Sequence, residues 1–205
     1  MANDLEKAQD RRIVRTRQAL YDALIELTEE RGLDGFTVND LCERADLNRG
    51  TFYNHFHDKE DLLASFEGEV LEHLEQFRGR MGDISLKDVA RATVLKRPIP
   101  LLVEVFDYLG RQGEFLHAML GDGGDASFAA RLRDSMCTEL VRSLLHERYR
   151  NSTDAFVGYY VAFYASAYMG VIGHWIQTGR KESSEDMARI AMRLLLIKPG
   201  ESIKL

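Results

Sequence analysis

The chain has 205 residues, of which 45% are hydrophobic and 29% charged, and this balance indicates one compact soluble protein or a small module joined to a larger one. Its net charge of −6 argues against a protein that coats nucleic acid without regard to sequence. Cys42 and Cys137 show no metal-ligand spacing, and the charged N-terminal segment has no apolar signal region, so we expect a reduced, cytoplasmic protein.

The first segment of the chain nevertheless concentrates positive charge. Between Lys7 and Arg17, five basic residues stand against a single acid, Asp10, which gives this basic arm a net charge of +4. A small basic cluster on an acidic protein fits local contact with phosphate groups, and it fits an ordinary solvated helix start equally well.

Helical periodicity dominates the chain, so we predict an all-α protein of about ten helices. Apolar residues recur at helical spacing almost everywhere, and no segment alternates with a period of two. The first helix is predicted at about residues 11–30 and ends before Gly32 and Gly35. Its apolar stripe contains Ile13, Leu20, Leu24 and Leu27.

Three segments with cap signals follow the first helix. Thr37 precedes a helix in which Asp40 occupies the third position, a pair typical of a capping box. Asn48 is expected to cap a helix with the sequence RGTFYNHF, and Asp58 a longer helix that reaches to about residue 78. Glycine-rich loops are predicted at residues 79–82 and 121–125. The other predicted helices are at about residues 86–95, 99–111, 114–120, 126–149, 153–178 and 184–197, the last capped by Ser183.

Residues 38–56 have the pattern of a helix-turn-helix, in which the second helix can lie in the major groove of DNA. Residues 46–48 form the predicted turn, and the facing apolar positions are Leu41, Ala45, Leu47, Phe52 and Phe56. The second helix directs polar residues outward: Arg49, Thr51, Tyr53, Asn54 and His55. A core helix does not normally expose such a set. Gly50 costs roughly 1 kcal/mol of helix propensity, which is understandable if the backbone must approach a partner closely.

The segment GFTVNDLCERADLNRGTFYNHFHDKEDLL resembles the DNA-binding segment of the TetR family of bacterial transcriptional regulators. The match covers about residues 12–66 and includes the long first helix, the FTV and RGTFYxHF motifs and the DKEDLL start of the fourth helix. The later segment FLHAMLGDGGDASFAARLRD is similar to one version of the family's helical C-terminal domain. The resemblance implies that residues 1–66 form a helix-turn-helix DNA-binding domain and residues 67–205 a helical effector-binding and dimerisation domain.

The resemblance also assigns site residues by position. Base contacts fall on Asn39, Arg49, Gly50 and Thr51, and phosphate contacts fall on Thr37, Tyr53, His55 and Lys59. Arg49 has the donors for a bidentate contact with guanine, and the second set can donate to phosphate oxygens. Simpler roles stay open, because Tyr53 can cover a hydrophobic edge and His55 can be a solvated surface residue. Lys59 can form a weak ion pair with its acidic neighbours.

Residues 155–179 contain no Asp, Glu, Lys or Arg and are long enough to cross a bilayer, which takes about 20 residues. Polar residues such as Tyr164, His174 and Gln177 are spread along this segment rather than gathered at its ends, so we predict a buried helix of a soluble dimer. Small residues recur at every fourth position and form a shallow groove for a neighbouring helix: Gly158, Ala162, Ser166 and Gly170.

The resemblance implies a homodimer joined by a four-helix bundle, with two helices from each subunit. The predicted helix at 126–149 also has an apolar row that must be buried, Leu132, Met136, Leu140 and Leu144. Two pairs of helices fit the bundle: 126–149 with 153–178, or 153–178 with 184–197. A dimer also suits DNA, because two modules related by a two-fold axis read a palindrome with half-sites about 34–36 Å apart.

The resemblance further implies a repressor that an unidentified small-molecule effector releases from a palindromic operator. The alternative is an activator or co-activator that works through protein contacts. Seven residues are able either to line an effector cavity or simply to form the core: Phe106, Tyr108, Phe115, Met119, Phe163, Met169 and Trp175. No effector-binding residue is assigned, and neither His117 nor His174 receives a role. Near the module, four acids must face away from the duplex: Glu26, Glu29, Glu30 and Asp34.

No catalytic residue, cofactor or metal site is expected. The sequence has no nucleophile elbow, no glycine-rich phosphate loop, no HExxH segment and no paired-cysteine motif. The GDGGD loop lacks the ligand spacing of a calcium site. The prediction is therefore a DNA-binding regulator that is neither an enzyme nor a membrane protein.

Overall fold

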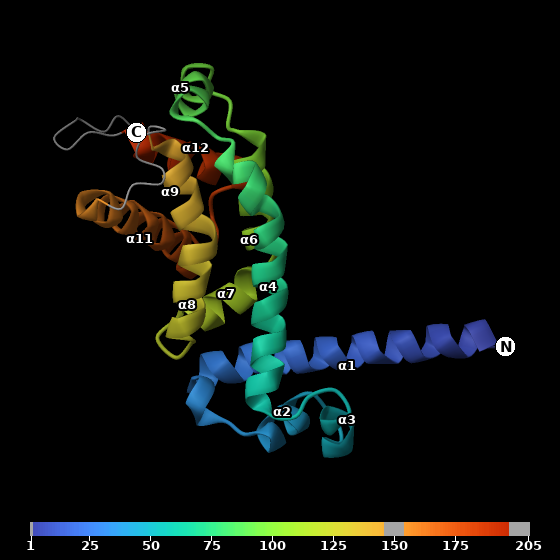
Figure 1. The fold of residues 1–205 in the computed structure, drawn as a ribbon. Helices are drawn as coiled ribbons and strands as arrows, with labels where there is room; N and C mark the ends of the chain where they lie inside the picture. Colours follow the sequence, from blue (N-terminus) through green and yellow to red (C-terminus); the bar gives the residue numbers. More distant parts are fainter. Residues whose placement is uncertain (1, 146–153, 197–205) are drawn as a thin grey trace. The chain divides into compact units, whose positions relative to one another are not determined.

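The structure is a computed structural model that describes residues 2–145 and 154–196, and every regular element within those ranges is helical (Figure 1). The all-α prediction is therefore confirmed. The chain divides into two compact units. The N-terminal unit comprises residues 1–70 and 118–128, and the larger unit comprises residues 71–117 and 129–205.

The N-terminal unit begins with a helix that is longer than predicted. α1 begins at Ala2 rather than near residue 11, because residues 2–10 are mostly good helix formers and include no glycine or proline. Its predicted apolar stripe is buried at Leu20, Leu24 and Leu27, whereas Ile13 is partly exposed. The elements of this unit are α1 (Ala2–Arg31), the turn η1 (Leu33–Gly35), α2 (Val38–Arg44), α3 (Arg49–Tyr53) and the first part of α4 (Lys59–Gly82), together with the helix ends and loop of residues 118–128.

Side-chain caps fix the starts of α2, α3 and α4, as predicted. Thr37 and Asp40 form a complete capping box: the Asp40 amide lies 3.3 Å from the Thr37 hydroxyl, and the Thr37 amide lies 2.8 Å from the Asp40 carboxylate. Asn48 and Asp58 cap α3 and α4, each accepting a hydrogen bond from a first-turn amide, at 2.8 and 2.7 Å. These bonds satisfy amides that the first turn of a helix otherwise leaves without a partner.

The capping box makes the N-terminal unit sensitive to acid. Hydrogen bonds from the side chain and backbone of Thr37, with a smaller contribution from Arg31, hold the pKa of Asp40 below its usual value of 3.8. Because the folded pKa is the lower one, the stabilisation is complete above the unfolded pKa and is lost as pH falls through the folded pKa. An Asp40→Asn variant should therefore melt below the parent near neutral pH, and this gap should close below about pH 4. A gap in melting temperature that persists unchanged into strong acid would exclude this role.

Aromatic residues form the core of the helix-turn-helix module. Phe52 and Phe56 are buried with ring centres 5.9 Å apart, and Phe66 of α4 lies 6.3 Å from Phe56. The Arg17 guanidinium lies 5.5 and 5.2 Å from the ring centres of Phe56 and Phe66 and donates a hydrogen bond to Ser65 at 3.3 Å. Burial of each such ring contributes roughly 1.5–3 kcal/mol, so this core fixes α3 on α1 and α4.

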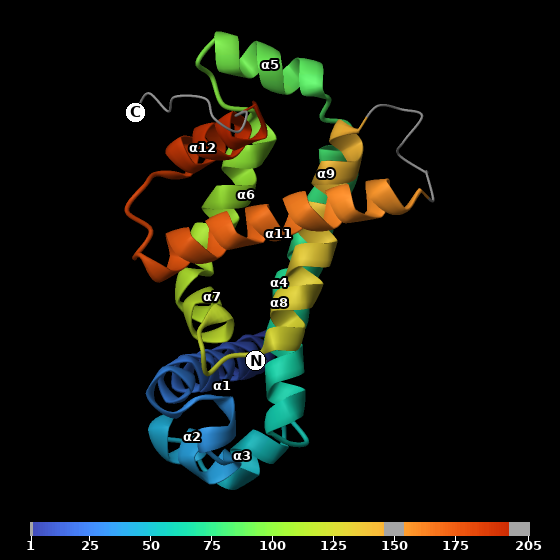
Figure 2. The same cartoon turned by 90° about the vertical axis from the view of Figure 1, so that its left-hand side faces the viewer.

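The larger unit is a bundle in which α11 packs on η2 and α9, and α12 packs on α6 (Figure 2). Besides the rest of α4, its elements are α5 (Leu86–Val94), α6 (Pro100–Arg111), most of α7 (Gly113–Leu120), the end of α8 (Ala126–Leu132), the π-helical segment η2 (Arg133–Cys137), α9 (Thr138–Leu144), α11 (Ala155–Gln177) and α12 (Ser184–Leu196). Ser183 caps α12, as predicted, by accepting a hydrogen bond from the Asp186 amide at 3.1 Å.

Two of the predicted boundaries in the larger unit are wrong. α4 continues through residues 79–82, because the burial of Phe77 and Met81 offsets the roughly 1 kcal/mol that each glycine costs in a helix. The helix predicted at 126–149 changes to π-helical hydrogen bonding at η2, and α9 ends at Leu144. The predicted residues 146–149 lie outside the described residues.

Both cysteines are free and buried, as expected for small hydrophobic residues. Burial raises the pKa of the Cys137 thiol to about 12, and the pKa of Cys42 is raised for the same reason. Since the thiolate is the reactive form of cysteine, neither residue has the environment of a nucleophile.

α11 has a buried face and an exposed apolar face. By length and hydropathy it qualifies as a membrane span, and 28% of its most apolar 18-residue stretch is buried within the single chain. The buried face contains Val157, Val161, Ala165, Tyr168, Ile172, Trp175 and Ile176. On the opposite face Phe156, Tyr159 and Phe163 are 74%, 77% and 68% exposed. So large an apolar surface on a single chain indicates a contact with something else.

Candidate DNA-binding surface

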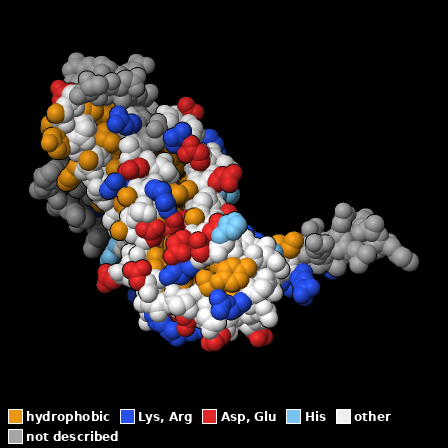
Figure 3. Space-filling model, turned by 60° about the horizontal axis from the view of Figure 1, so that its bottom comes forward, with side chains coloured by type: hydrophobic (Ala, Val, Ile, Leu, Met, Phe, Trp, Pro, Cys, Tyr) orange, Lys and Arg blue, Asp and Glu red, His pale blue; other side chains and the backbone are white. Residues whose placement is uncertain are grey.

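α3 presents one face to the core and the other to solvent. Phe52 is fully buried, whereas Tyr53 is 49% exposed and Arg49 is also exposed. Thr51 and His55 are partly exposed at the edge of this face. Helical spacing therefore predicts correctly which side of α3 faces outward. Figure 3 views this end of the N-terminal unit, where basic and acidic side chains lie around a small hydrophobic patch.

Arg49 and Tyr53 lie one turn apart on α3 and contact each other. Nη2 of Arg49 donates a hydrogen bond to the Tyr53 hydroxyl at 3.3 Å, and the guanidinium carbon lies 5.8 Å from the ring centre. The hydrogen bond to Tyr53 is the main cause that raises the pKa of Arg49. One of five N–H donors is used in this way, so the guanidinium keeps enough donors for a bidentate contact.

Gly50 follows the cap of α3 and has a local structural reason to lack a side chain. A Cβ atom at this position would lie 3.3 Å from Oδ1 of Asn48, the atom that accepts the Gly50 amide hydrogen bond. A larger residue would therefore press on the cap. The backbone of Gly50 is also exposed, which leaves it accessible to a partner.

Thr37 and Asn39 already have hydrogen-bond partners within the module. The Thr37 hydroxyl donates to Asp40 at 2.6 Å, and the Asn39 amide donates to Glu43 at 3.0 Å. Either side chain has to break its internal hydrogen bond before it can donate to DNA. This lowers the net free energy gained from a contact with DNA.

Lys59 has a structural contact that the sequence did not predict. Its ammonium donates to the carbonyls of Leu33 and Phe36 at 2.7 and 3.1 Å and lies 4.9 Å from the ring centre of Phe36. These bonds join the start of α4 to η1 and leave one N–H donor for another acceptor. No periodic pattern links Lys59 to carbonyls so far away in sequence, so sequence reasoning had no signal for them.

A Lys59→Ala variant separates the phosphate contact from this structural contact. If Lys59 binds a phosphate, its loss should weaken binding to all duplexes by a similar factor and lower the salt slope of log K by about one unit. Loss of the carbonyl contacts should also lower the melting temperature. Lys59→Arg keeps the charge and serves as the control in a salt titration. A salt slope unchanged in Lys59→Ala would remove Lys59 from the phosphate set.

Two of the acids near the module share one cation, Arg44, which offsets part of their negative charge. Arg44 donates to Glu26 at 2.8 Å and to both carboxylate oxygens of Glu30 at 2.7 and 2.9 Å. The hydrogen bond from Arg44 lowers the pKa of Glu30, so the pair stays charged near neutral pH. Their mutual compensation reduces the repulsion that these acids would exert on a duplex.

The basic arm on α1 is only partly available to a partner. Arg17 contacts the aromatic core and pairs with Glu69, so it has a structural role. Arg11, Arg12 and Arg15 are exposed. These three arginines keep the arm positive at the surface and able to contact phosphate groups.

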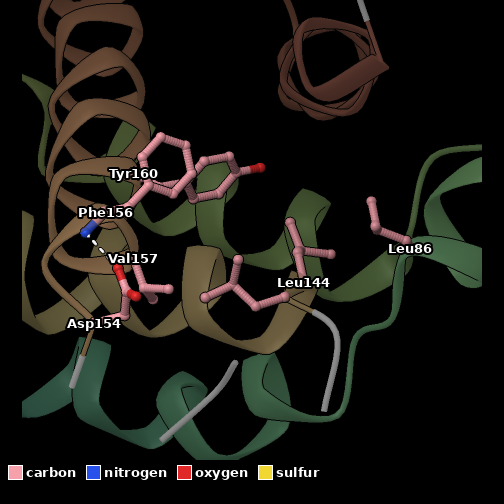
Figure 4. Close-up of a pocket in the computed structure, with 7 residues that line it drawn as sticks. Leu86, Leu144, Asp154, Phe156, Val157 and Tyr160 are labelled. Atoms are coloured by element: carbon pink, nitrogen blue, oxygen red, sulfur yellow. Dashed lines mark hydrogen bonds between the residues drawn. The ribbon is translucent and has the colours of Figure 1, made fainter. Parts of the chain in front are cut away.

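A hollow of about 490 Å³ lies in the larger unit and has the size of a small-molecule site. Figure 4 shows its mainly apolar lining with the Tyr160 hydroxyl and the Asp154 carboxylate, which caps α11 by accepting the Phe156 amide hydrogen bond at 2.8 Å. Its lining residues are Leu86, Leu144, Leu145, Asp154, Phe156, Val157 and Tyr160. This lining suits an apolar molecule that carries a hydrogen-bond donor.

A second hollow, of about 380 Å³, lies between α11 and α12 and is lined by Trp175 and His174 among others. Of the seven residues that the sequence offered as able to line an effector cavity, Trp175 alone lines one of these two hollows. Phe163 is exposed, and four candidates are buried in the core: Phe106, Tyr108, Phe115 and Met119. None of the seven lines the larger hollow, whose apolar residues had no distinguishing pattern in the sequence.

Two family models match the chain. The model described as bacterial regulatory proteins, tetR family, matches residues 20–66, and a model described as a transcriptional regulator C-terminal region matches residues 96–196. The first match contains the whole helix-turn-helix, and the second begins before α6 and ends with α12.

Similar proteins include an uncharacterized HTH-type transcriptional regulator, YxbF, of Bacillus subtilis, which is 25% identical over 198 residues, or 94% of this chain and 48% of that protein. The HTH-type transcriptional repressor DhaR of a Mycobacterium species is 31% identical over 96 residues, or 46% of each chain. The chain thus spans about half the length of these curated relatives.

Solved structures share the fold. A TetR transcriptional regulator from Streptococcus agalactiae aligns with a TM-score of 0.57 at 23% identity, over 93% of this chain and 98% of that one. The fatty acid degradation regulator FadR from Bacillus halodurans aligns with a TM-score of 0.60 at 17% identity, over 91% and 97%. At such low identity these likenesses show the fold alone.

Proposed function

The chain belongs to the TetR family of bacterial DNA-binding transcriptional regulators, and on that premise we propose that it is a repressor that binds a palindromic operator as a homodimer and is released by a small-molecule effector. The observation that carries the proposal is the exposure of Arg49 and Tyr53 on the side of α3 opposite the buried Phe52. We place the protein in the cytoplasm, in contact with DNA and not with a membrane.

In this proposal α3 reads the major groove. Arg49 contacts guanine, with Gly50 and Thr51 beside it and Asn39 orienting or reading a neighbouring base. Thr37, Tyr53, His55 and Lys59 contact phosphates and fix the register of the module on the duplex. Of the eight positions, Arg49 and Tyr53 have the strongest support, because both are exposed and hold each other in place.

The dimer is proposed to form through α11 and α12. The alternative pairing would use the helix that precedes α11. Its apolar row is already buried within one chain: Leu132, Met136, Leu140 and Leu144. In contrast, the small-residue stripe of α11 is exposed, and added Cβ atoms at Gly158 and Gly170 would meet nothing within 4 Å. On α12, Ile190 and Leu194 are also exposed. Two such apolar helices from each chain suit a four-helix bundle.

We favour a repressor over an activator as the role of this protein. DhaR, whose name describes a repressor, is 31% identical over 96 residues, whereas the dihydroxyacetone kinase operon activator DhaS shares the fold at 18% identity with a TM-score of 0.53. The alternative, an activator or co-activator that acts through protein contacts, predicts that transcription from the bound operator rises when the protein is present.

Selection of duplexes from a random pool tests the proposed function. The full chain should enrich a palindromic sequence, and an in vitro transcription assay should show less transcript when that operator overlaps the promoter. Failure to enrich any sequence would refute operator binding, and enrichment of an asymmetric site would refute the two-fold arrangement.

A further inference from the structure

The polar side chains of the larger hollow accept hydrogen bonds rather than offer them. Asp154 is an acceptor when ionised; it takes the Phe156 amide hydrogen bond at 2.8 Å, and a carboxylate can accept several such bonds at once. Burial raises the pKa of Tyr160, and a hydrogen bond to Tyr164 raises it further. A hydrogen bond raises the pKa of a phenol when the phenol donates it, so the hydrogen of Tyr160 is directed to Tyr164. A ligand in this hollow must therefore bring the donor.

The charge at the hollow favours a cation over an anion. Among the described residues that line it, none is basic, and Asp154 contributes a full negative charge. The start of α11 opposes this charge, because a helix N-terminus carries roughly half an elementary positive charge. The carboxylate charge is the larger of the two, so the donor that fits best is an ammonium group. Phe156 and Tyr160 add aromatic rings to the same lining, and the face of such a ring attracts a cation (Figure 4).

The remaining lining of the hollow is apolar and extends away from the carboxylate. In Figure 4, Val157 and Leu144 lie on the side of Asp154 that leads to Leu86. Val157 and Leu144 are buried, and Leu145 completes this apolar lining. A hydrocarbon chain attached to the ammonium group can cover these side chains, and removal of its methylene groups from water favours binding.

We propose that this hollow is the effector site and that the effector is an apolar ammonium compound. Asp154 pairs with the ammonium group, while Leu144 and Val157 bury the hydrocarbon chain. This inference rests on the proposed function, since it names the chemical class of the molecule that releases the operator. Phe156 belongs both to the hollow and to the exposed face of α11 that is proposed for the dimer, so a bound ligand alters the surface on which two chains pair.

Isothermal titration calorimetry of the DNA-free full chain tests the site with three probes that share a ten-carbon chain: decylammonium, decanol and decanoate. Near neutral pH, decylammonium should bind about fivefold more tightly than decanol, because Asp154 attracts its charge. Decanoate should bind more weakly than decanol, because the same carboxylate repels it. Equal affinities for the three probes, or the highest affinity for decanoate, would overturn the proposal.

An Asp154→Asn variant locates the ammonium group within the chain. Asparagine removes the charge and still caps a helix well, so α11 should keep its start. The affinity for decylammonium should fall about fivefold, and the affinity for decanol should stay the same. Asp58→Asn is the matched control, because Asp58 caps α4 in the same way in the other unit, and it should bind every probe as the parent does. A decylammonium affinity that Asp154→Asn leaves unchanged, or a decanol affinity that falls equally, would contradict the assignment.

Release of the enriched duplex tests the effector role separately. Saturating decylammonium should weaken the affinity of the parent for this duplex about tenfold or more. Ethylammonium at the same concentration controls for the effect of a free cation on DNA binding and should release nothing. If decylammonium binds the DNA-free chain but leaves duplex affinity unchanged, the hollow is not the effector site. If the parent enriches no duplex, operator binding itself has failed, and the calorimetry still decides whether the hollow binds an ammonium compound.

Discussion

Replacing Phe163 with Glu should convert the dimer into monomers and remove most of the affinity for a palindromic duplex. Phe163 is 68% exposed in a single chain and lies one turn from Tyr159 on α11, which is 77% exposed. An unpaired carboxylate in a desolvated contact costs on the order of 3 kcal/mol, and two-fold symmetry applies the cost twice. The dimer dissociation constant should therefore rise by about four orders of magnitude, which sedimentation equilibrium measures directly.

Val94→Glu is the matched control for this change. Val94 is 82% exposed at the end of α5, outside the proposed interface, so the same substitution there should leave the dimer and its DNA affinity unchanged. A Phe163→Glu protein that remains dimeric would exclude this face of α11 from the interface. A monomeric parent would exclude the homodimer itself.

Replacing Arg49 with Ala should weaken operator binding by about 1–3 kcal/mol per half-site contact and relax specificity at one base pair. The expected loss follows from the bidentate pattern of a guanidinium on guanine. Because Arg49 is exposed and its contact within the protein is to Tyr53, the melting temperature should change little. Competition between the parent operator and its single-base variants provides the measurement.

Arg49→Lys distinguishes base reading from simple charge. Lysine keeps the positive charge but lacks the planar pair of donors, so it should retain the salt dependence of binding while losing most of the base preference. If Arg49→Ala discriminates among the variant duplexes as the parent does, the base-reading role of Arg49 is wrong.

Much of the N-terminal unit follows from local sequence signals. The caps at Thr37, Asn48 and Asp58 depend on residues within one helical turn, so short motifs were enough to predict them. The exposure of Arg49 and Tyr53 likewise follows from the spacing of the buried Phe52 and Phe56 on the same short segment.

Contacts between distant residues were beyond prediction from the sequence. The carbonyl partners of Lys59 and the approach of Gly123 to Gly32 join parts of the chain that share no periodic pattern. The continuation of α4 through residues 79–82 depends on burial of Phe77 and Met81, which outweighs the low helix propensity of glycine. Packing between distant segments depends on the whole fold, so the sequence of one segment does not indicate it.

The spacing between half-sites tests most directly whether paired larger units set the distance between two α3 helices. Inserting five base pairs at the centre of the enriched palindrome turns one half-site by about half a helical turn away from the other. The affinity of the full chain should then fall to that for a duplex with a single half-site. Equal affinity for the original and the lengthened palindromes would contradict this account.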